Sequence, residues 1–209
     1  PRSQGAALPG VPLPGDQPFR MPSAALAFAA AFLRNPRRVG AVAPASRWLA
    51  EAVGRQLDGC ACDTLIEVGP GTGAITRVLN EPGGCSARVW AGAGDEWWVS
   101  GRRARYAGRE FVPGCASGLS RHVRVTSPVA IVSSLPFKSL PEDTAAGCIR
   151  ALVDTLDSGP GSMLLKYTYG LSSPPFELPA ARFAWSRVDL VMRNLPPATI
   201  WRLEHNPQR

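Results

Sequence analysis

The sequence predicts an α/β domain in which a doubly wound, mostly parallel sheet ends in an antiparallel hairpin. Three observations support this prediction. Short apolar segments alternate with helical ones over residues 46–167, as in sheets whose parallel strands are joined by crossover helices. A glycine-rich loop, residues 69–73, follows the first strand directly. Two apolar segments of the tail, residues 183–192 and 199–203, flank a turn that contains two prolines, which predicts the hairpin.

The predicted domain covers residues 23–209, and residues 1–22 are expected to form a flexible leader or an upstream addition. This first stretch is rich in proline and glycine and lacks a periodic apolar pattern. It is therefore expected to contribute little to the hydrophobic core. A helix is expected over residues 23–33, because Ser23 can cap its start and Asn35-Pro36 ends it. That apolar stretch is too short to span a bilayer, and no signal-peptide cleavage site follows it.

Two more helices are predicted around the first strand. Residues 64–68 form an apolar run of strand length, and residues 74–79 resume the helical pattern after the glycine loop. Before them, residues 46–57 have apolar side chains at helical spacing, on the side that carries Trp48, Leu49, Ala52 and Val53.

The second half of the domain continues the alternation of strands and helices. Apolar runs bounded by turn residues predict strands over 88–91, 110–112, 129–132 and 162–167. Two helices are expected between them, one that contains Trp97, Trp98 and Tyr106 and one over residues 144–156.

The composition allows one globular domain and gives no support for a metal site. A chain of 209 residues, 45% of them apolar, is long enough to bury a core. The five cysteines are odd in number and scattered, and Cys60-Ala61-Cys62 lacks the two-residue spacing of zinc ligands. We therefore expect reduced thiols, a cytoplasmic location and no metal centre.

The net charge of +7 comes almost entirely from arginine, because Lys138 and Lys166 are the only lysines. This balance suits RNA, an anionic membrane surface or an acidic substrate, and it equally suits a compositional bias. Arginines do not alternate with aromatic residues as in a nucleic-acid platform, so nucleic acid is not the expected partner. Phe28, Phe32 and Trp48 stand beside arginines, which suits either peripheral contact with the inner membrane surface or packing against the sheet.

The glycine loop allows a nucleotide-like cofactor to approach the backbone closely. Gly69, Gly71 and Gly73 provide three positions without a Cβ directly after the first strand. With Ala74, the first two glycines also satisfy the dinucleotide pattern, whose ribose-binding acid ends the second strand. The first acid after that strand is Asp95, which lies just beyond its end, so a nicotinamide enzyme is a minor alternative.

Tyr167 and Tyr169 stand with Lys166 at the end of the fifth predicted strand, at the edge where such sheets bind ligands. A tyrosine there can stack on a cation or orient an amine. The two tyrosines are therefore the candidate catalytic residues. The alternative interpretation is an ordinary strand with hydroxyl groups at the sheet edge.

Several segments together resemble a known family. The combination is similar to small bacterial S-adenosylmethionine-dependent methyltransferases of the phospholipid N-methyltransferase type, relatives of the rRNA adenine dimethyltransferases, and it covers the chain from about Ser23 onward. This resemblance implies the class I methyltransferase fold, and Glu67, immediately before the glycine loop, favours it over the nicotinamide alternative. The segments are residues 32–36 with 40–46, the glycine loop, Ser133-Ser134-Leu135-Pro136-Phe137, Tyr167-Thr168-Tyr169-Gly170 with Ser173-Pro174, and residues 194–198.

The resemblance implies a role for each candidate site residue. The three loop glycines would contact the methionine and ribose parts of S-adenosylmethionine, and Glu67 would orient the loop or a bound water. The segment that begins at Ser133 would present a polar atom and an aromatic ring to the target amine, with Ser133 on the cofactor side. Ser134 and Phe137 would line the substrate site, although Phe137 equally suits a core aromatic at a strand end.

Two departures from the family pattern affect the nucleoside-binding residues. The family ends its second strand with an acid that holds the ribose hydroxyls, and here Ala93 takes that place. An acidic turn after the third strand contacts the adenine, and here Cys115 replaces the acid. Loss of a carboxylate bound to a ribose diol costs about one to two decades of affinity. A small loop shift would let Asp95 or Glu96 partly substitute for the missing acid.

Three functional hypotheses follow. The first is S-adenosylmethionine-dependent N-methylation of a lipophilic amine or a small natural-product-like molecule, with alignment rather than acid–base chemistry as the main source of rate. The second is an enzyme of methyltransferase fold that no longer transfers methyl and instead catalyses cyclisation, isomerisation or another step. The third is an RNA- or membrane-surface-binding module, supported by charge alone. The oligomeric state is not indicated by the sequence.

Overall fold

The computed structural model describes residues 45–80, 87–90, 110–112, 114–123, 128–171, 173–178 and 182–206. The expected leader, the helix over residues 23–33 and the helix around Trp97, Trp98 and Tyr106 lie outside these ranges, as do Ala93 and Asp95. Within them, no helix is long and apolar enough to cross a bilayer.

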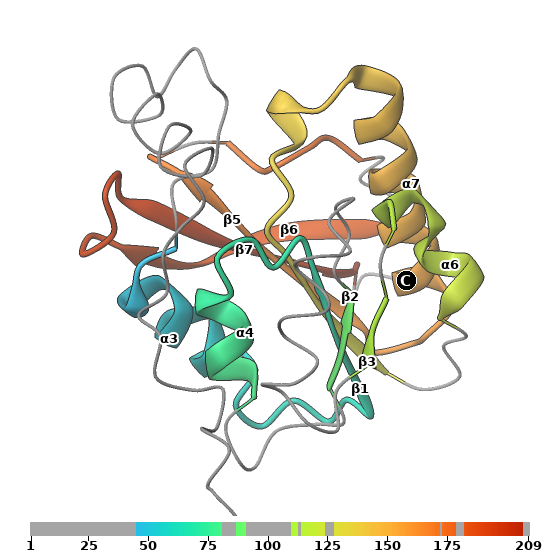
Figure 1. The fold of residues 1–209 in the computed structure, drawn as a ribbon, viewed down its shortest axis with the longest axis horizontal. Helices are drawn as coiled ribbons and strands as arrows, with labels where there is room; N and C mark the ends of the chain where they lie inside the picture. The colour runs from blue at the N-terminus through green and yellow to red at the C-terminus, as the bar shows by residue number, and fades with distance from the viewer. Residues whose placement is uncertain are drawn as a thin grey trace, which may run out of the picture.

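A seven-stranded sheet with the order β3-β2-β1-β4-β5-β7-β6 organises the domain (Figure 1). The strands on both sides of β1 run parallel to it, and β7 pairs antiparallel with both β5 and β6. This arrangement confirms the predicted doubly wound sheet with a C-terminal hairpin. The strands are β1 Thr64–Val68, β2 Ala87–Trp90, β3 Glu110–Phe111, β4 Val129–Ser133, β5 Met163–Tyr169, β6 Phe183–Val191 and β7 Ala198–His205.

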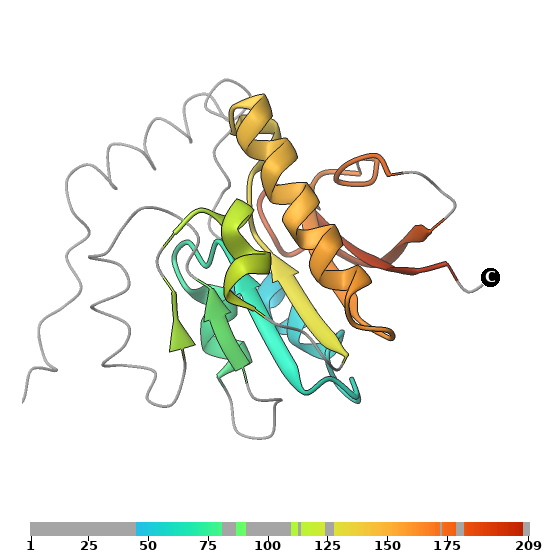
Figure 2. The same ribbon diagram turned by 90° about the vertical axis from the view of Figure 1, so that its right-hand side faces the viewer.

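Helices cover both faces of the sheet because successive strand residues point to opposite sides. Leu65 of β1 packs in one buried cluster with α3 and α4, whereas its neighbour Ile66 packs in another with α6 and α7. Figure 2 shows α6 and α7 together on one side of the sheet. The helices are α3 Arg47–Arg55, α4 Ala74–Leu79, α6 Leu119–His122 and α7 Glu142–Asp157, with 3-10 turns η1 Ala116–Gly118 and η2 Phe137–Ser139.

Most boundaries agree with the sequence-based expectation, and two differ for a physical reason. Helix α7 begins at Glu142 rather than at residue 144, since Glu142 and Asp143 in its first turn interact favourably with the helix dipole. Strand β5 continues to Tyr169 because that residue pairs with Ala198 of β7. A strand end that depends on a partner distant in sequence is not visible in the local pattern.

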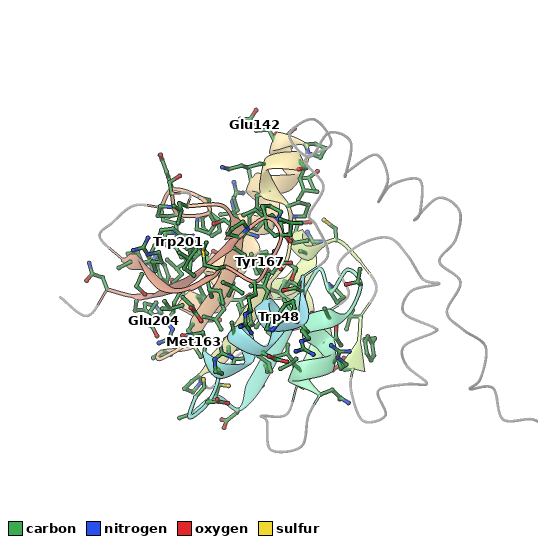
Figure 3. All side chains as sticks on the ribbon, turned by 90° about the vertical axis from the view of Figure 1, so that its left-hand side faces the viewer. Trp48, Glu142, Met163, Tyr167, Trp201 and Glu204 are labelled. Carbon is green, nitrogen blue, oxygen red and sulfur yellow. The ribbon has the colours of Figure 1, made fainter. Side chains whose placement is uncertain are left out.

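Helix α3 packs on the sheet through four small or aliphatic residues. Ser46 caps it, as the Leu49 backbone N–H donates to the Ser46 Oγ at 3.2 Å. Trp48, which was expected on the same side as Leu49, is 37% exposed instead, and the Arg47 guanidinium lies 4.8 Å from the centre of its ring (Figure 3). The buried face consists of Leu49, Ala50, Ala52 and Val53.

The turn between β6 and β7 is joined to the start of α3 by a buried amide side chain. The Ser46 backbone N–H donates to the Asn194 Oδ1 at 3.0 Å, and the Asn194 Nδ2 donates to the Pro196 carbonyl at 2.7 Å. Asn194 is 2% exposed, whereas Ser46 and Pro196 are half-buried. This side chain therefore fixes the hairpin turn against the cap of α3.

We predict that Asn194→Ala lowers the free energy of unfolding by about 1–2 kcal/mol, because it removes two hydrogen bonds to the half-buried Ser46 N–H and Pro196 carbonyl. Urea denaturation followed by circular dichroism measures the change. Met192→Ala is the matched control in the same turn, and its exposed side chain should change stability by less than about 0.5 kcal/mol. Equal effects of the two substitutions would contradict the proposed role of the Asn194 hydrogen bonds.

Candidate functional site

The glycine loop leaves β1 at Val68 and enters α4 through three left-handed residues. The φ angles of Gly69, Gly71 and Gly73 are +72°, +50° and +78°, a region that residues with a side chain rarely adopt. The Gly73 N–H donates to the Pro70 carbonyl at 2.8 Å and closes the turn. All three predicted glycines therefore occupy positions whose backbone conformation favours glycine.

Gly69 and Gly71 differ in what an added side chain would meet. A Cβ on Gly69 would lie 2.9 Å from the Leu135 Cδ2, so the loop and the segment after β4 are in close contact. A Cβ on Gly71 would meet only the Gly69 carbonyl, at 3.9 Å, and both Gly71 and Thr72 are exposed. The loop thus presents bare backbone at the carboxyl edge of the sheet, as a cofactor cradle requires.

The segment after β4 is held beside this loop by a backbone bond. Ser133 pairs with Val68 in the parallel register of β4 and β1. One residue later, the Ser134 N–H donates to the Val68 carbonyl at 2.9 Å. The predicted cofactor loop and the predicted substrate segment therefore meet at the same edge.

A polar cluster lies on the α3 side of this edge. Glu67 is 1% exposed and follows Leu65 on that face, and Tyr167 packs in the same buried cluster as Leu65. The rings of Tyr167 and Tyr169 meet edge to face with their centroids 5.7 Å apart. The Tyr167 hydroxyl is hydrogen-bonded to the side chains of Ser134 and Tyr169. The fold thus brings together four predicted site residues. They are Glu67 of β1, Ser134 directly after β4, and Tyr167 and Tyr169 of β5.

Both tyrosine hydroxyls keep their protons at neutral pH. Burial raises the pKa of Tyr167, and the nearby Glu67 carboxylate raises it further. Burial also raises the pKa of Tyr169, as does its hydrogen bond to Tyr167. A phenol with a raised pKa is a poor general base at neutral pH. The pair can instead position a polar ligand through neutral hydrogen bonds and ring edges.

Lys166, which the sequence groups with the two tyrosines, lies on the opposite face of β5. Its Nζ donates to the Leu135 carbonyl at 2.6 Å and lies 4.7 Å from the centre of the Phe137 ring. Burial lowers the pKa of Lys166 to about 7. The two-residue period of a strand separates this amine from Tyr167 and Tyr169, although the three residues are adjacent in sequence.

Ser133 and Phe137 also lie on the α7 side. Ser133 is fully buried, and its Oγ accepts from the Leu135 N–H at 3.5 Å. Phe137 is 8% exposed and meets the Phe176 ring edge to face at 5.5 Å. Phe137 therefore has the packing of a core aromatic in this structure. The cofactor role of Ser133 and the substrate role of Phe137 remain predictions.

Cys115 lies apart from the tyrosine cluster, at the start of η1. It is exposed, and its Sγ lies 3.9 Å from the Sγ of Cys148 on α7. The sequence did not indicate this pairing, because the two residues lie 33 positions apart. The adenine contact expected at Cys115 stays a prediction, and Asp95 lies outside the described residues.

Solved structures place this geometry in a known fold. One similar structure is a 1,6-didemethyltoxoflavin-N1-methyltransferase from Burkholderia thailandensis with bound S-adenosylhomocysteine (14% identity, 92% of this chain, 94% of that chain, TM-score 0.55). Another is an rRNA methylase from Streptococcus thermophilus (18% identity, 74% and 94%, TM-score 0.53). A third is the magnesium protoporphyrin IX methyltransferase from Synechocystis PCC 6803 with bound SAM (11% identity, 90% and 99%, TM-score 0.51).

These likenesses confirm the fold predicted from the sequence. At identities of 11–18%, they show the class I methyltransferase fold and not the reaction or the substrate. No protein-family model matches the sequence, and a search for similar curated proteins finds no match.

We predict that the stability contribution of Lys166 depends on pH. Its pKa is about 7 in the folded chain against 10.5 for an ordinary lysine, so the unfolded state binds more protons between these values. The free energy of unfolding of the wild type should therefore rise with pH relative to Lys166→Met, by up to about 1.4 kcal/mol per pH unit. Urea denaturation at pH 7, 8 and 9 measures the difference, below the range where tyrosines ionise.

Lys138 provides the matched control, because it is the only other lysine and its side chain is exposed. Lys138→Met should follow the pH trend of the wild type. Parallel stability curves for the wild type and Lys166→Met would contradict the prediction.

Proposed function

We propose that this protein is an S-adenosylmethionine-dependent methyltransferase that methylates a nitrogen atom of a lipophilic amine or a small natural-product-like molecule. The observation that carries the proposal is the bare-backbone cradle of Gly69, Gly71 and Gly73 at the carboxyl edge of a class I methyltransferase sheet. Glu67, at the end of β1, and the tyrosine cluster lie at the same edge. An N1-methyltransferase with bound S-adenosylhomocysteine shares the fold.

The residues of the cradle fit such a cofactor. Gly71 has open space where a Cβ would stand, and it is exposed. Backbone without side chains permits the close approach that a nucleoside with a methionine tail needs. The cofactor supplies an electrophilic methyl group on a sulfonium. Gly69, Gly71 and Gly73 would hold it, and Glu67 would orient the loop or a bound water.

The remaining site residues would position the amine. Tyr167 and Tyr169 remain neutral and hold each other edge to face, so they provide a rigid wall with hydroxyl groups at fixed places. Ser134 connects this wall to the end of β1 through its backbone N–H. Methyl transfer to an uncharged amine needs alignment and exclusion of water rather than a strong base. A small lipophilic substrate suits an aromatic wall of this kind.

We predict that Gly71→Ala weakens binding of S-adenosylhomocysteine by about ten-fold or more, which corresponds to about 1.4 kcal/mol. The wild type is expected to bind this ligand with a micromolar dissociation constant. The new methyl group would enter the open space of the cradle, and the φ of +50° would strain the loop. Isothermal titration calorimetry measures the affinity, and thermal unfolding shows whether the variant is folded.

Gly59→Ala is the matched control for backbone strain. Gly59 has a φ of +73° with no atom within 4 Å of its added Cβ, and it lies in the turn after α3. Both variants should lose stability to a similar degree, and only Gly71→Ala should lose affinity. No heat and no thermal shift with wild-type protein at millimolar ligand would exclude the proposed cofactor.

A second prediction concerns the tyrosine wall. Tyr167→Phe should reduce kcat for methyl transfer by about ten- to hundred-fold, because it removes the hydroxyl that joins Ser134 to Tyr169 while it keeps the ring. Transfer of labelled methyl groups to a panel of lipophilic amines measures the rate. Thr168→Val is the control, since Thr168 lies between the tyrosines and bonds Trp201 instead.

The same assay distinguishes the two enzymatic hypotheses. Binding of S-adenosylmethionine without transfer of label to any amine would favour an enzyme that no longer transfers methyl. Equal rates for Tyr167→Phe and Thr168→Val would remove the tyrosines from the proposed mechanism and leave the cofactor cradle intact.

A further inference from the structure

Two cysteines from different elements face each other on the α7 side of the domain. Cys115 is the residue before η1, and Cys148 lies in the middle of α7. Their Sγ atoms are 3.9 Å apart, so a movement of about 2 Å would bring them to the length of a disulfide.

The backbone around the pair is packed closely enough to keep the two sulfurs together. A Cβ added to Gly147 of α7 would lie 3.3 Å from the Ser117 Cβ in η1. The missing side chain at Gly147 thus lets η1 rest directly on α7, one residue before Cys148. This close approach does not depend on the thiols themselves.

The two thiols have different chemical environments. Cys115 is exposed, and hydrogen bonds from the side chain and the backbone of Ser117 lower the pKa of its thiol. Cys148 is 2% exposed, and burial raises the pKa of its thiol to about 11. An accessible thiol with a lowered pKa reacts first with disulfides and soft electrophiles. The buried Cys148 thiol lies close enough to attack the Cys115 Sγ and displace the group that Cys115 has bound.

We propose that Cys115 and Cys148 form a thiol-modification site that reacts with small-molecule disulfides and closes into an intramolecular disulfide between η1 and α7. The Cys115 thiolate attacks one sulfur of a small disulfide and releases one thiolate. Cys148 then loses its proton to that thiolate and attacks the Cys115 Sγ, which releases the second small thiolate. This thiolate takes up from water the proton that Cys115 had lost. Two protein thiols are oxidised by two electrons, and one small disulfide is reduced to two thiols.

This site does not rest on the proposed methyl transfer, because the reaction needs only the two sulfurs and the contact between η1 and α7. A closed bond would fix the segment that follows β3 to α7, the helix that follows β4 in the chain. Since the carboxyl ends of β1, β3 and β4 share one edge of the sheet, the link would restrain that edge.

Oxidised glutathione and peptide mapping test the proposal on the full chain. Wild-type protein should lose two alkylatable thiols and yield a cross-linked peptide that contains Cys115 and Cys148. Cys148→Ser should stop at a mixed disulfide with glutathione on Cys115. Cys115→Ser should yield neither product, and alkylation of its remaining Cys148 should be at least about ten-fold slower than alkylation of Cys115 in Cys148→Ser.

Two controls connect the result to the fold. Cys60→Ser removes a partly exposed cysteine outside the pair and should form the cross-link at the wild-type rate. In concentrated urea, the preference for the pair of Cys115 and Cys148 should disappear. The proposal is overturned if the folded wild type gives no cross-linked peptide, if Cys115 pairs with a different cysteine, or if the same preference persists in urea.

Discussion

The contact between Gly69 and Leu135 is the constraint on which the geometry of the candidate site depends. A Cβ at Gly69 would approach the Leu135 Cδ2 to 2.9 Å, and the φ of +72° at Gly69 is one that residues with a side chain rarely adopt. Glycine therefore suits the junction where the loop after β1 meets the segment after β4. The Ser134 N–H bond to Val68 fixes the same junction from the backbone side. Because both segments also carry the predicted ligand contacts, one steric condition sets the distance between the cofactor loop and the substrate segment.

The pleat of the strands divides the polar groups of this edge into two sets. Glu67 and the two tyrosines point to the α3 side, whereas Lys166 points to the α7 side and contacts the Leu135 carbonyl. The first set consists of a carboxylate and neutral hydroxyls next to the glycine cradle. The second set is the buried Lys166 amine, which donates to the Leu135 carbonyl in the segment after β4. A substitution of Glu67 or of a tyrosine therefore tests ligand binding. A substitution of Lys166 tests the conformation of the segment after β4.

The antiparallel hairpin extends the same edge and holds it in place. The Gly170 N–H donates to the Pro197 carbonyl at 2.6 Å, and the Thr199 hydroxyl donates to the Gly170 carbonyl at 2.7 Å. These bonds anchor the end of β5 directly after Tyr169. The hairpin thus contributes to the site through the position of the tyrosine wall, although none of the predicted ligand contacts comes from β6 or β7.

The sequence by itself determined the fold class, the glycine loop and nearly all described strands, because apolar alternation and glycine spacing are local signals. Residues 64–68 and 74–79 coincide with β1 and α4, and the loop glycines have the conformations that their type suggests. Local patterns could not assign Trp48 to the exposed side of α3. The two-residue period of a strand separates Lys166 from Tyr167, but local patterns could not tell which of them faces α3 and which faces α7. They also gave no indication that Cys115 meets Cys148. Those features depend on which distant elements pack together, and only the tertiary structure decides that.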